Sequence, residues 1–262
     1  MLDRRTFIKK GIVCTGAASA VAVGKTSGAT TKPFGVGGYD YRLPALAKGS
    51  RLVFLGDSIT DMKWGRNERD RNHYLGHSYV YLIASRLGVD MPEAGLEFFN
   101  RGISGNKVGD LRSRWQKDAI DMKPDLLSIL IGVNDVSQGG GKNVPLDRWE
   151  ADYRFILDSS RQANAALRLV LLDPFVLRSG RLQGEDPWKY WRRQVDKMGG
   201  IVARLAEQYH AVHVKTQDLF DVAARMASPG HWIWDGVHPL PQGHELIARH
   251  WLQQVSARWK RP

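Results

Sequence analysis

The sequence of 262 residues contains one cysteine, Cys14, so no disulfide bond within the chain is expected. It has no apolar run of about 18 residues, which argues against a membrane-spanning helix, and no tandem repeat. The formal net charge is +11. The sequence has no dense basic run, zinc-finger spacing or RNP-like aromatic motif, which argues against nucleic acid as a partner. The charge therefore indicates a basic surface.

The first 29 residues differ in composition from the rest of the chain. Arg4 and Arg5 stand side by side, and an uncharged stretch of 14 residues follows at 11–24. That stretch is too short for a stop-transfer helix, and the whole segment resembles a twin-arginine export signal. We therefore expect residues 1–29 to be a signal peptide, with the cleavage site left open between two small-residue triplets. The mature protein would then be periplasmic or secreted, with no stable membrane insertion after cleavage.

The remainder of the chain is predicted to be a linker at 30–49 and one domain at 50–262. Short apolar runs, typical of strands buried on both faces, alternate in that domain with longer amphipathic segments. The expected strands are 51–56, 96–100, 126–132, 167–173 and 211–216, and the expected helices are 77–87, 147–163, 190–209 and 242–258. This alternation predicts a three-layer α/β/α sandwich around a five-stranded, mainly parallel sheet.

Polar and glycine-rich stretches follow three of the expected strands, and a fourth precedes the last expected helix. They read GDSIT at 56–60, NRGISGN at 100–106, GVND at 132–135 and WDGVHP at 234–239. Ligands of open parallel sheets bind outside the carboxyl ends of the strands. We therefore expect these four stretches to meet at one site.

Their residue types suit nucleophilic catalysis. Ser58 offers a hydroxyl that becomes a good nucleophile only when a base removes its proton, and His238 is suited to that task. Asp235, three residues before His238, would orient the imidazole. The backbone N–H groups of Ser58 and Gly105, with the side-chain amide of Asn134, would stabilise the oxyanion. Asp57 is interpreted as a turn residue.

These four stretches resemble those of the SGNH (GDSL-type) hydrolase superfamily, and the resemblance covers about residues 50–258. Ser58, Gly105, Asn134 and His238 with its Asp235 match the serine, glycine, asparagine and histidine blocks in order. The resemblance implies a flavodoxin-like fold and a serine esterase mechanism with no cofactor or metal. Gly102 competes with Gly105 for the second block, although Gly105 fits the pattern better. A G-x-S-x-G motif is absent, which argues against the α/β-hydrolase family.

Within the superfamily, the segments between the blocks are most similar to bacterial acetylxylan esterases. That similarity implies removal of O-acetyl groups from a carbohydrate, either xylan or a xylo-oligosaccharide, through an acyl-enzyme. Trp234 and Trp64 are candidates for contacting a sugar ring. The same site would also suit a lysophospholipase, a thioesterase or a general short-chain esterase. A carbohydrate-binding module without activity is disfavoured because no catalytic residue is missing. The sequence leaves the oligomeric state open.

Overall fold

The computed structural model describes residue 39 and residues 41–260. The predicted signal peptide at 1–29 and residues 30–38 of the predicted linker lie outside the described residues. The described part of the linker packs on the domain: Leu46 is buried, and the N–H of Ala45 donates to the carbonyl of Trp259 at 2.6 Å. The folded unit therefore includes residues before the predicted boundary at residue 50.

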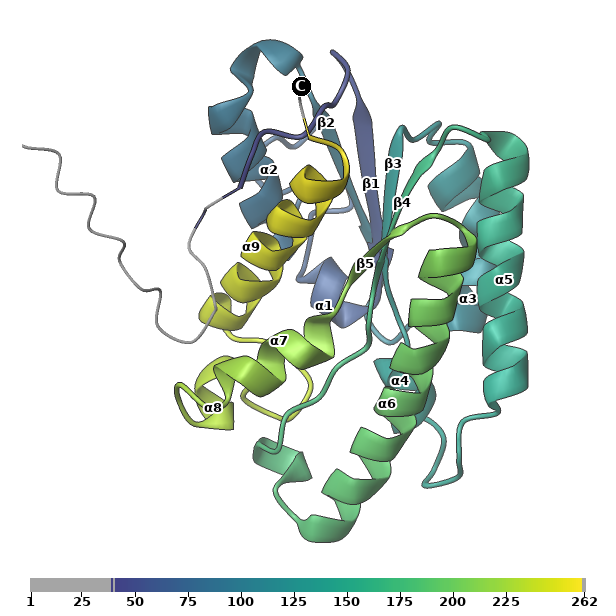
Figure 1. Ribbon diagram of the computed structural model, residues 1–262, viewed down its shortest axis with the longest axis vertical. Coiled ribbons are helices and arrows are strands. Elements are labelled where there is room, and N and C mark those ends of the chain that lie inside the picture. Colours follow the sequence, from purple (N-terminus) through teal and green to yellow (C-terminus); the bar gives the residue numbers. More distant parts are fainter. Residues whose placement is uncertain (1–38, 40, 261–262) are drawn as a thin grey trace, which may run out of the picture. The chain divides into compact units, whose positions relative to one another are not determined.

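Five parallel strands form one sheet in the order β2-β1-β3-β4-β5. All of them coincide with the apolar runs of the sequence, and β3 is buried at every position. Their bounds are Arg51–Gly56 (β1), Glu97–Gly102 (β2), Leu126–Leu130 (β3), Arg168–Leu172 (β4) and Val212–Val214 (β5). With helices on both faces, the sheet confirms the predicted three-layer sandwich, here with every strand parallel (Figure 1).

Long helices cover both faces of the sheet (Figure 1). On one face α2 (Tyr79–Asp90) packs against α9 (Pro241–Arg258), and on the other the short helix α3 (Val108–Trp115) packs against α5 (Leu146–Ala163) beside α6 (Glu185–Gln208). The other helices are α1 (Ser58–Asp61), α4 (Val133–Ser137), α7 (Thr216–Ala223) and α8 (Pro229–Trp232). Within residues 39 and 41–260, every helix is too short or too polar to cross a membrane.

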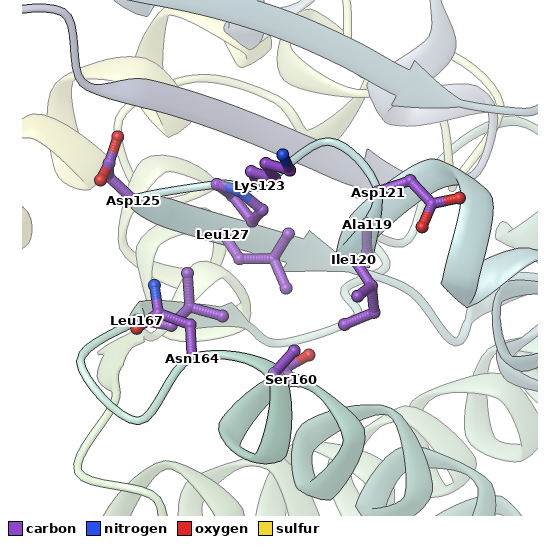
Figure 2. Close-up of a pocket in the computed structure, with 11 residues that line it drawn as sticks. Ala119, Ile120, Asp121, Lys123, Asp125, Leu127, Ser160, Asn164 and Leu167 are labelled. Atoms are coloured by element: carbon purple, nitrogen blue, oxygen red, sulfur yellow. The ribbon is translucent and has the colours of Figure 1, made fainter.

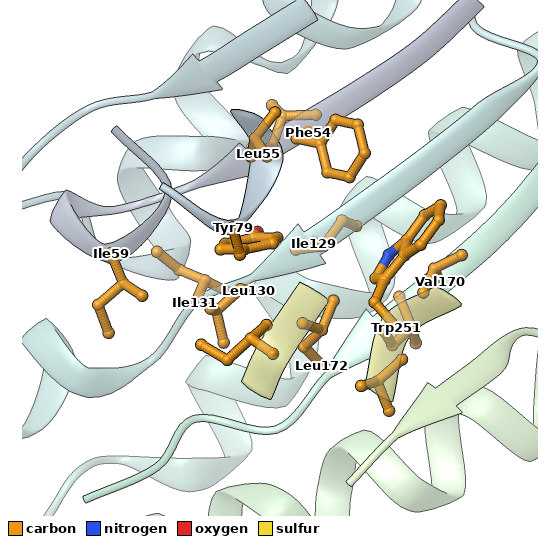
Figure 3. Close-up of a cluster of buried hydrophobic side chains, with 14 of the residues drawn as sticks. Phe54, Leu55, Ile59, Tyr79, Ile129, Leu130, Ile131, Val170, Leu172 and Trp251 are labelled. Atoms are coloured by element: carbon orange, nitrogen blue, oxygen red, sulfur yellow. The ribbon is translucent and has the colours of Figure 1, made fainter. Parts of the chain in front are cut away.

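Aromatic side chains on the α2/α9 face link the sheet to the first turn after β1 (Figure 3). The ring of Phe54 lies 5.6 Å from that of Trp251 and 6.2 Å from that of Tyr79, measured between centroids. The polar atoms of these rings have partners, since the indole N–H of Trp251 donates to Ser128 Oγ at 3.0 Å. The Tyr79 hydroxyl lies within hydrogen-bond distance of Thr60 Oγ1, at 3.0 Å, so this aromatic cluster contacts α1 directly.

Candidate active site

The strand order places the predicted site at the carboxyl ends of the strands. The chain starts at the inner strand β1 and runs outward to β2 on one side and to β3 on the other. Ligands of such sheets bind beyond the carboxyl ends of the strands on either side of this reversal. Ser58 follows β1, Gly105 follows β2 and Asn134 follows β3. The three residues therefore occupy the region where the fold is expected to bind a ligand.

Ser58 begins a single helical turn, α1, directly after β1. The preceding Asp57 caps this turn, since its carboxylate accepts a hydrogen bond from the N–H of Ile59 at 3.0 Å. Gly56 leaves room for the turn: a Cβ there would lie 2.5 Å from the carbonyl oxygen of Leu130 and 2.3 Å from Thr60 Oγ1. The stretch that ends β1 is thus a tight turn that leaves Ser58 half-buried at the edge of the sheet.

His238 connects Ser58 with Asp235. Its Nε2 lies 2.8 Å from Ser58 Oγ, and its Nδ1 lies 2.8 Å from Asp235 Oδ2. A carboxylate only accepts hydrogen bonds, so Nδ1 carries the proton and Nε2 is left to accept from the serine hydroxyl. In this tautomer the imidazole is ready to take the Ser58 proton.

Asp235 is held in its ionised form. Burial alone would raise the pKa of this carboxyl, but hydrogen bonds from the His238 ring and from backbone N–H groups outweigh burial and lower the pKa to about 2. The backbone donors are Val237 N at 3.0 Å and His238 N at 2.7 Å, both bound to Oδ1. The second oxygen, Oδ2, is therefore aimed at the imidazole as an anion throughout the neutral pH range.

The loop after β2 and the start of α4 supply the predicted oxyanion donors. Gly105 has φ +84°, a conformation that favours glycine, and its N–H donates to no residue that the structure describes. Asn134 Nδ2 donates one hydrogen to the carbonyl of Asn106 at 3.1 Å, which leaves its second hydrogen for a ligand. By contrast, the N–H of Gly102 donates to Asn100 Oδ1 at 2.9 Å. Of the two glycines, Gly105 therefore has the available donor.

Comparison with known proteins identifies the family. Residues 54–246 match the model of the GDSL-like lipase/acylhydrolase family, and this match spans all four sequence blocks. The chain belongs to this family. The predicted GDSL-type resemblance is thereby confirmed, and the protein is a carboxylic ester hydrolase of the GDSL type.

Relatives of this GDSL-type hydrolase include characterised esterases. It is 35% identical over 223 residues to the acetylxylan esterase of Geobacillus stearothermophilus, covering 82% of this chain and 98% of the relative. The crystal structure of that esterase superposes with a TM-score of 0.71. Its solved catalytic mutants each replace a serine, an aspartate or a histidine by alanine. A multidomain esterase of Ruminococcus flavefaciens is 24% identical over 247 residues, 84% of this chain and 30% of the relative.

The two tryptophans predicted to contact substrate have different environments in this GDSL-type hydrolase. Trp234 precedes Asp235 and is 60% exposed, so its ring is accessible to a ligand. Trp64 is 7% exposed, and its indole N–H donates to the carbonyl of Gly102 at 2.9 Å. Arg66 and Arg101 also lie over the Trp64 ring, at 4.7 and 5.5 Å from guanidinium carbon to centroid. This burial argues against substrate contact by Trp64 and indicates a structural role under the 61–76 loop.

One cleft of the described residues lies away from the predicted site. It measures about 420 Å³ and lies at the amino-terminal ends of β3 and β4 (Figure 2). Ser160, its hydroxyl residue, already donates to the carbonyl of Ile156 and accepts from the indole of Trp115. A hydroxyl that already donates and accepts a hydrogen bond, with no base beside it, is a poor nucleophile.

Among the described residues, no group of three or more His, Cys, Asp or Glu side chains is arranged for a metal ion.

Two charged residues near the site were not expected from the sequence. Arg181 Nη2 lies 3.8 Å from Asp235 Oδ2, because the turn Gly180–Leu182 packs directly on the Asp235 backbone. Asp61 Oδ2 accepts from the N–H and the hydroxyl of Ser104, in the loop that carries Gly105. Both contacts join segments more than forty residues apart, so sequence spacing gave no signal for either.

Asp57 provides a prediction about pH and stability. Burial is the main cause that raises the pKa of its carboxyl to about 7, whereas an unfolded aspartate titrates near about 3.9. The folded state therefore binds this proton more tightly than the unfolded state, and the free energy of unfolding falls as the pH rises from about 4 to about 7. Replacing Asp57 with asparagine is expected to remove this part of the fall. The difference between the two pKa values corresponds to about 4 kcal/mol, so the drop in Tm between pH 4 and pH 8 should shrink by roughly 10 °C.

Thermal unfolding followed by circular dichroism measures this difference. Asp186→Asn changes the same atoms on an exposed aspartate and should follow the wild-type profile. Burial also raises the pKa of Asp135 to about 7. The decrease in stability that Asp135 causes as the pH rises is therefore present in wild type and in both variants. Parallel Tm curves for wild type and Asp57→Asn would show that the Asp57 carboxyl does not take up a proton on folding.

Proposed function

We propose that this hydrolase removes O-acetyl groups from xylan or xylo-oligosaccharides through an acetyl-enzyme on Ser58. The observation that carries the proposal is the hydrogen-bonded chain Ser58–His238–Asp235 at the carboxyl edge of the sheet. Similarity to an acetylxylan esterase over 98% of that protein supports the substrate class.

In the proposed first half-reaction, His238 Nε2 takes the Ser58 proton as Oγ attacks the carbonyl carbon of the acetyl ester. Negative charge then develops on the carbonyl oxygen, where the N–H groups of Ser58 and Gly105 and the Asn134 amide donate. Asp235 stabilises the imidazolium and remains ionised. His238 returns its proton to the sugar oxygen, which leaves as an alcohol.

In the second half-reaction, water replaces the sugar. His238 Nε2 takes a proton from that water as its oxygen attacks the acetyl carbon on Ser58, and the same donors hold the oxyanion. The Ser58 oxygen then leaves and regains a proton from His238, releasing acetate. His238 therefore carries every proton transfer in this cycle.

The 61–76 loop favours a short acyl group over a long one. Lys63, Arg66, Asn67, Glu68 and Arg69 are all exposed in this loop. A long acyl chain lying beside them would gain little from burying apolar surface, since the neighbouring surface is charged. This observation favours an acetylesterase over the lysophospholipase and thioesterase alternatives.

Acetate release from acetylated xylan by the purified full chain tests the proposal, beside a series of nitrophenyl esters from acetate to laurate. We expect acetate release from xylan and a kcat/KM for the nitrophenyl esters that is highest at acetate or butyrate. Longer acyl chains would lack the apolar contacts worth about 0.8 kcal/mol per methylene, so kcat/KM should not rise toward laurate. Activity that rises toward laurate, with no acetate released from xylan, would contradict the proposed substrate class.

A further inference from the structure

The loop that carries Gly105 is held mainly by hydrogen bonds. Ile103, Ser104 and Gly105 are exposed, so side-chain packing contributes little to its position. Glycine populates more backbone conformations than any other residue, and Gly105 holds a positive φ of +84°. Without further restraint, the direction of its N–H would vary.

The peptide groups on both sides of that N–H are fixed by side chains from other segments. On one side, the N–H and the hydroxyl of Ser104 donate to Asp61 Oδ2 at 2.9 and 2.7 Å. On the other side, the carbonyl of Gly105 accepts from Gln138 Nε2 at 2.8 Å. The peptide between Ser104 and Gly105, which carries the N–H, is thereby held from both ends.

Gln138 stands one helical turn after Asn134. The N–H of Gln138 donates to the carbonyl of Asn134 at 3.0 Å, and side chains four residues apart lie on one side of a helix. Their amides bind consecutive carbonyls of the loop, Asn134 that of Asn106 and Gln138 that of Gly105. One turn of chain therefore carries one predicted oxyanion donor and also holds the backbone that carries another.

We propose that Gln138 is a positioning residue that sets the direction of the Gly105 N–H toward the oxyanion; this inference rests on the proposed function. Among the described residues its side chain donates to the Gly105 carbonyl and not to Ser58, and it acts through that carbonyl. The loss of kcat expected on substitution of Gln138 follows from the donor that it positions. Deleting an oxyanion donor costs about 10²–10³ in kcat, and misplacing one costs up to about 10².

Four substitutions in the full chain test this role. Gln138→Met removes the donor at similar size and is expected to lower kcat for an acetate ester about 10-fold. Gln138→Glu places a carboxylate against the Gly105 carbonyl and is expected to lower kcat about 10²-fold. Gln138→Lys restores a donor and should recover most of the loss in Gln138→Met. Gln208→Glu, the matched control, makes the same change on an exposed glutamine of α6 and keeps an acceptor for Arg154.

Inhibition by an alkyl boronic acid separates positioning from a structural role. The boronate forms a tetrahedral adduct with an active serine, so its Ki reports the oxyanion donors directly. We expect Ki to rise by the same factor as kcat/KM falls, with KM for the ester nearly unchanged. A lower content of folded enzyme would instead reduce the apparent kcat and leave Ki unchanged, and that result would overturn the proposal.

Asn134→Ala distinguishes failure of this inference from failure of the proposed function. If Asn134→Ala loses about 10²-fold in kcat while both Gln138→Met and Gln138→Glu match wild type, Gln138 has no positioning role and the esterase mechanism stands. If Asn134→Ala also matches wild type, the assignment of the oxyanion donors is wrong, and the role of Gln138 fails with it.

Discussion

Replacing Ser58 with alanine is expected to reduce kcat for ester hydrolysis by about 10⁵–10⁶-fold, because it removes the hydroxyl that lies within hydrogen-bond distance of the proposed base, His238. The oxyanion donors and the substrate contacts remain in this variant. A residual rate of about 10³-fold over water is therefore expected from them. The measurement is steady-state hydrolysis of a nitrophenyl acetate by highly purified protein.

Ser113→Ala is the matched control for this experiment. Ser113 is an exposed serine of α3 whose hydroxyl donates to the carbonyl of Asp110, so its loss should leave activity and fold unchanged. Both variants should unfold within a few degrees of wild type, since Ser58 is half-buried and its hydroxyl bonds only to His238 among the described residues. Activity within about tenfold of wild type in Ser58→Ala would show that another residue is the nucleophile.

Replacing Asp235 with asparagine is expected to lower kcat by about 10⁴-fold. The asparagine oxygen can still accept from Val237 N and His238 N, so the loop should keep its shape. Its amide nitrogen would then face His238 Nδ1 and donate a hydrogen, which moves the imidazole proton to Nε2. In that tautomer His238 has no lone pair for the Ser58 proton. KM for the ester should change little, because both Asp235 oxygens already accept hydrogen bonds from the His238 ring or from backbone N–H groups.

The main rival for this role is Asp57, whose charge also acts on His238. The pKa values of the two carboxyls are shifted in opposite directions from the ordinary value of an aspartate. The pKa of Asp235 is lowered to about 2, whereas that of Asp57 is raised to about 7. Only Asp235 is therefore reliably an anion near neutral pH. Comparing Asp57→Asn with Asp235→Asn at pH 7 decides between them: a larger loss of kcat in Asp57→Asn would contradict the role assigned to Asp235.

Much of the fold could be predicted because its strands are buried on both faces. LLSILIG marked β3, although the strand ends at Leu130, where the chain turns toward Gly132 with φ +135°. The long helices were predictable from their apolar faces. The start of α6 was placed five residues late, since its first turn, Glu185–Lys189, is mostly polar. The short helix α3 was missed: it does bury Val108, Leu111 and Trp115 on one face, but it has only eight residues, three of them charged.

The site could be predicted in part for a related reason. Residues that directly follow parallel strands meet at one edge whatever the details of packing, so Ser58, Gly105 and Asn134 could be placed from the chain order. The contacts of Gln138 and Arg181 depend on how a loop or turn lies against a distant segment. Trp64 was named as a candidate for contacting a sugar ring, but its side chain is only 7% exposed, and the sequence does not reveal that burial. Sequence spacing carries no information on such contacts.

Trapping the acyl-enzyme tests the central claim, that Ser58 is the nucleophile, most directly. Wild-type protein is mixed with excess nitrophenyl acetate, quenched in acid within milliseconds, digested and analysed by mass spectrometry. In wild type we expect one added acetyl group on the peptide that contains Ser58. The acetylated fraction should be larger in Asp235→Asn if deacylation slows more than acylation. The acetyl group should be absent from Ser58→Ala. Rapid turnover of the ester with unmodified Ser58, or an acetyl group on another residue that accumulates and decays at the rate of turnover, would contradict this claim.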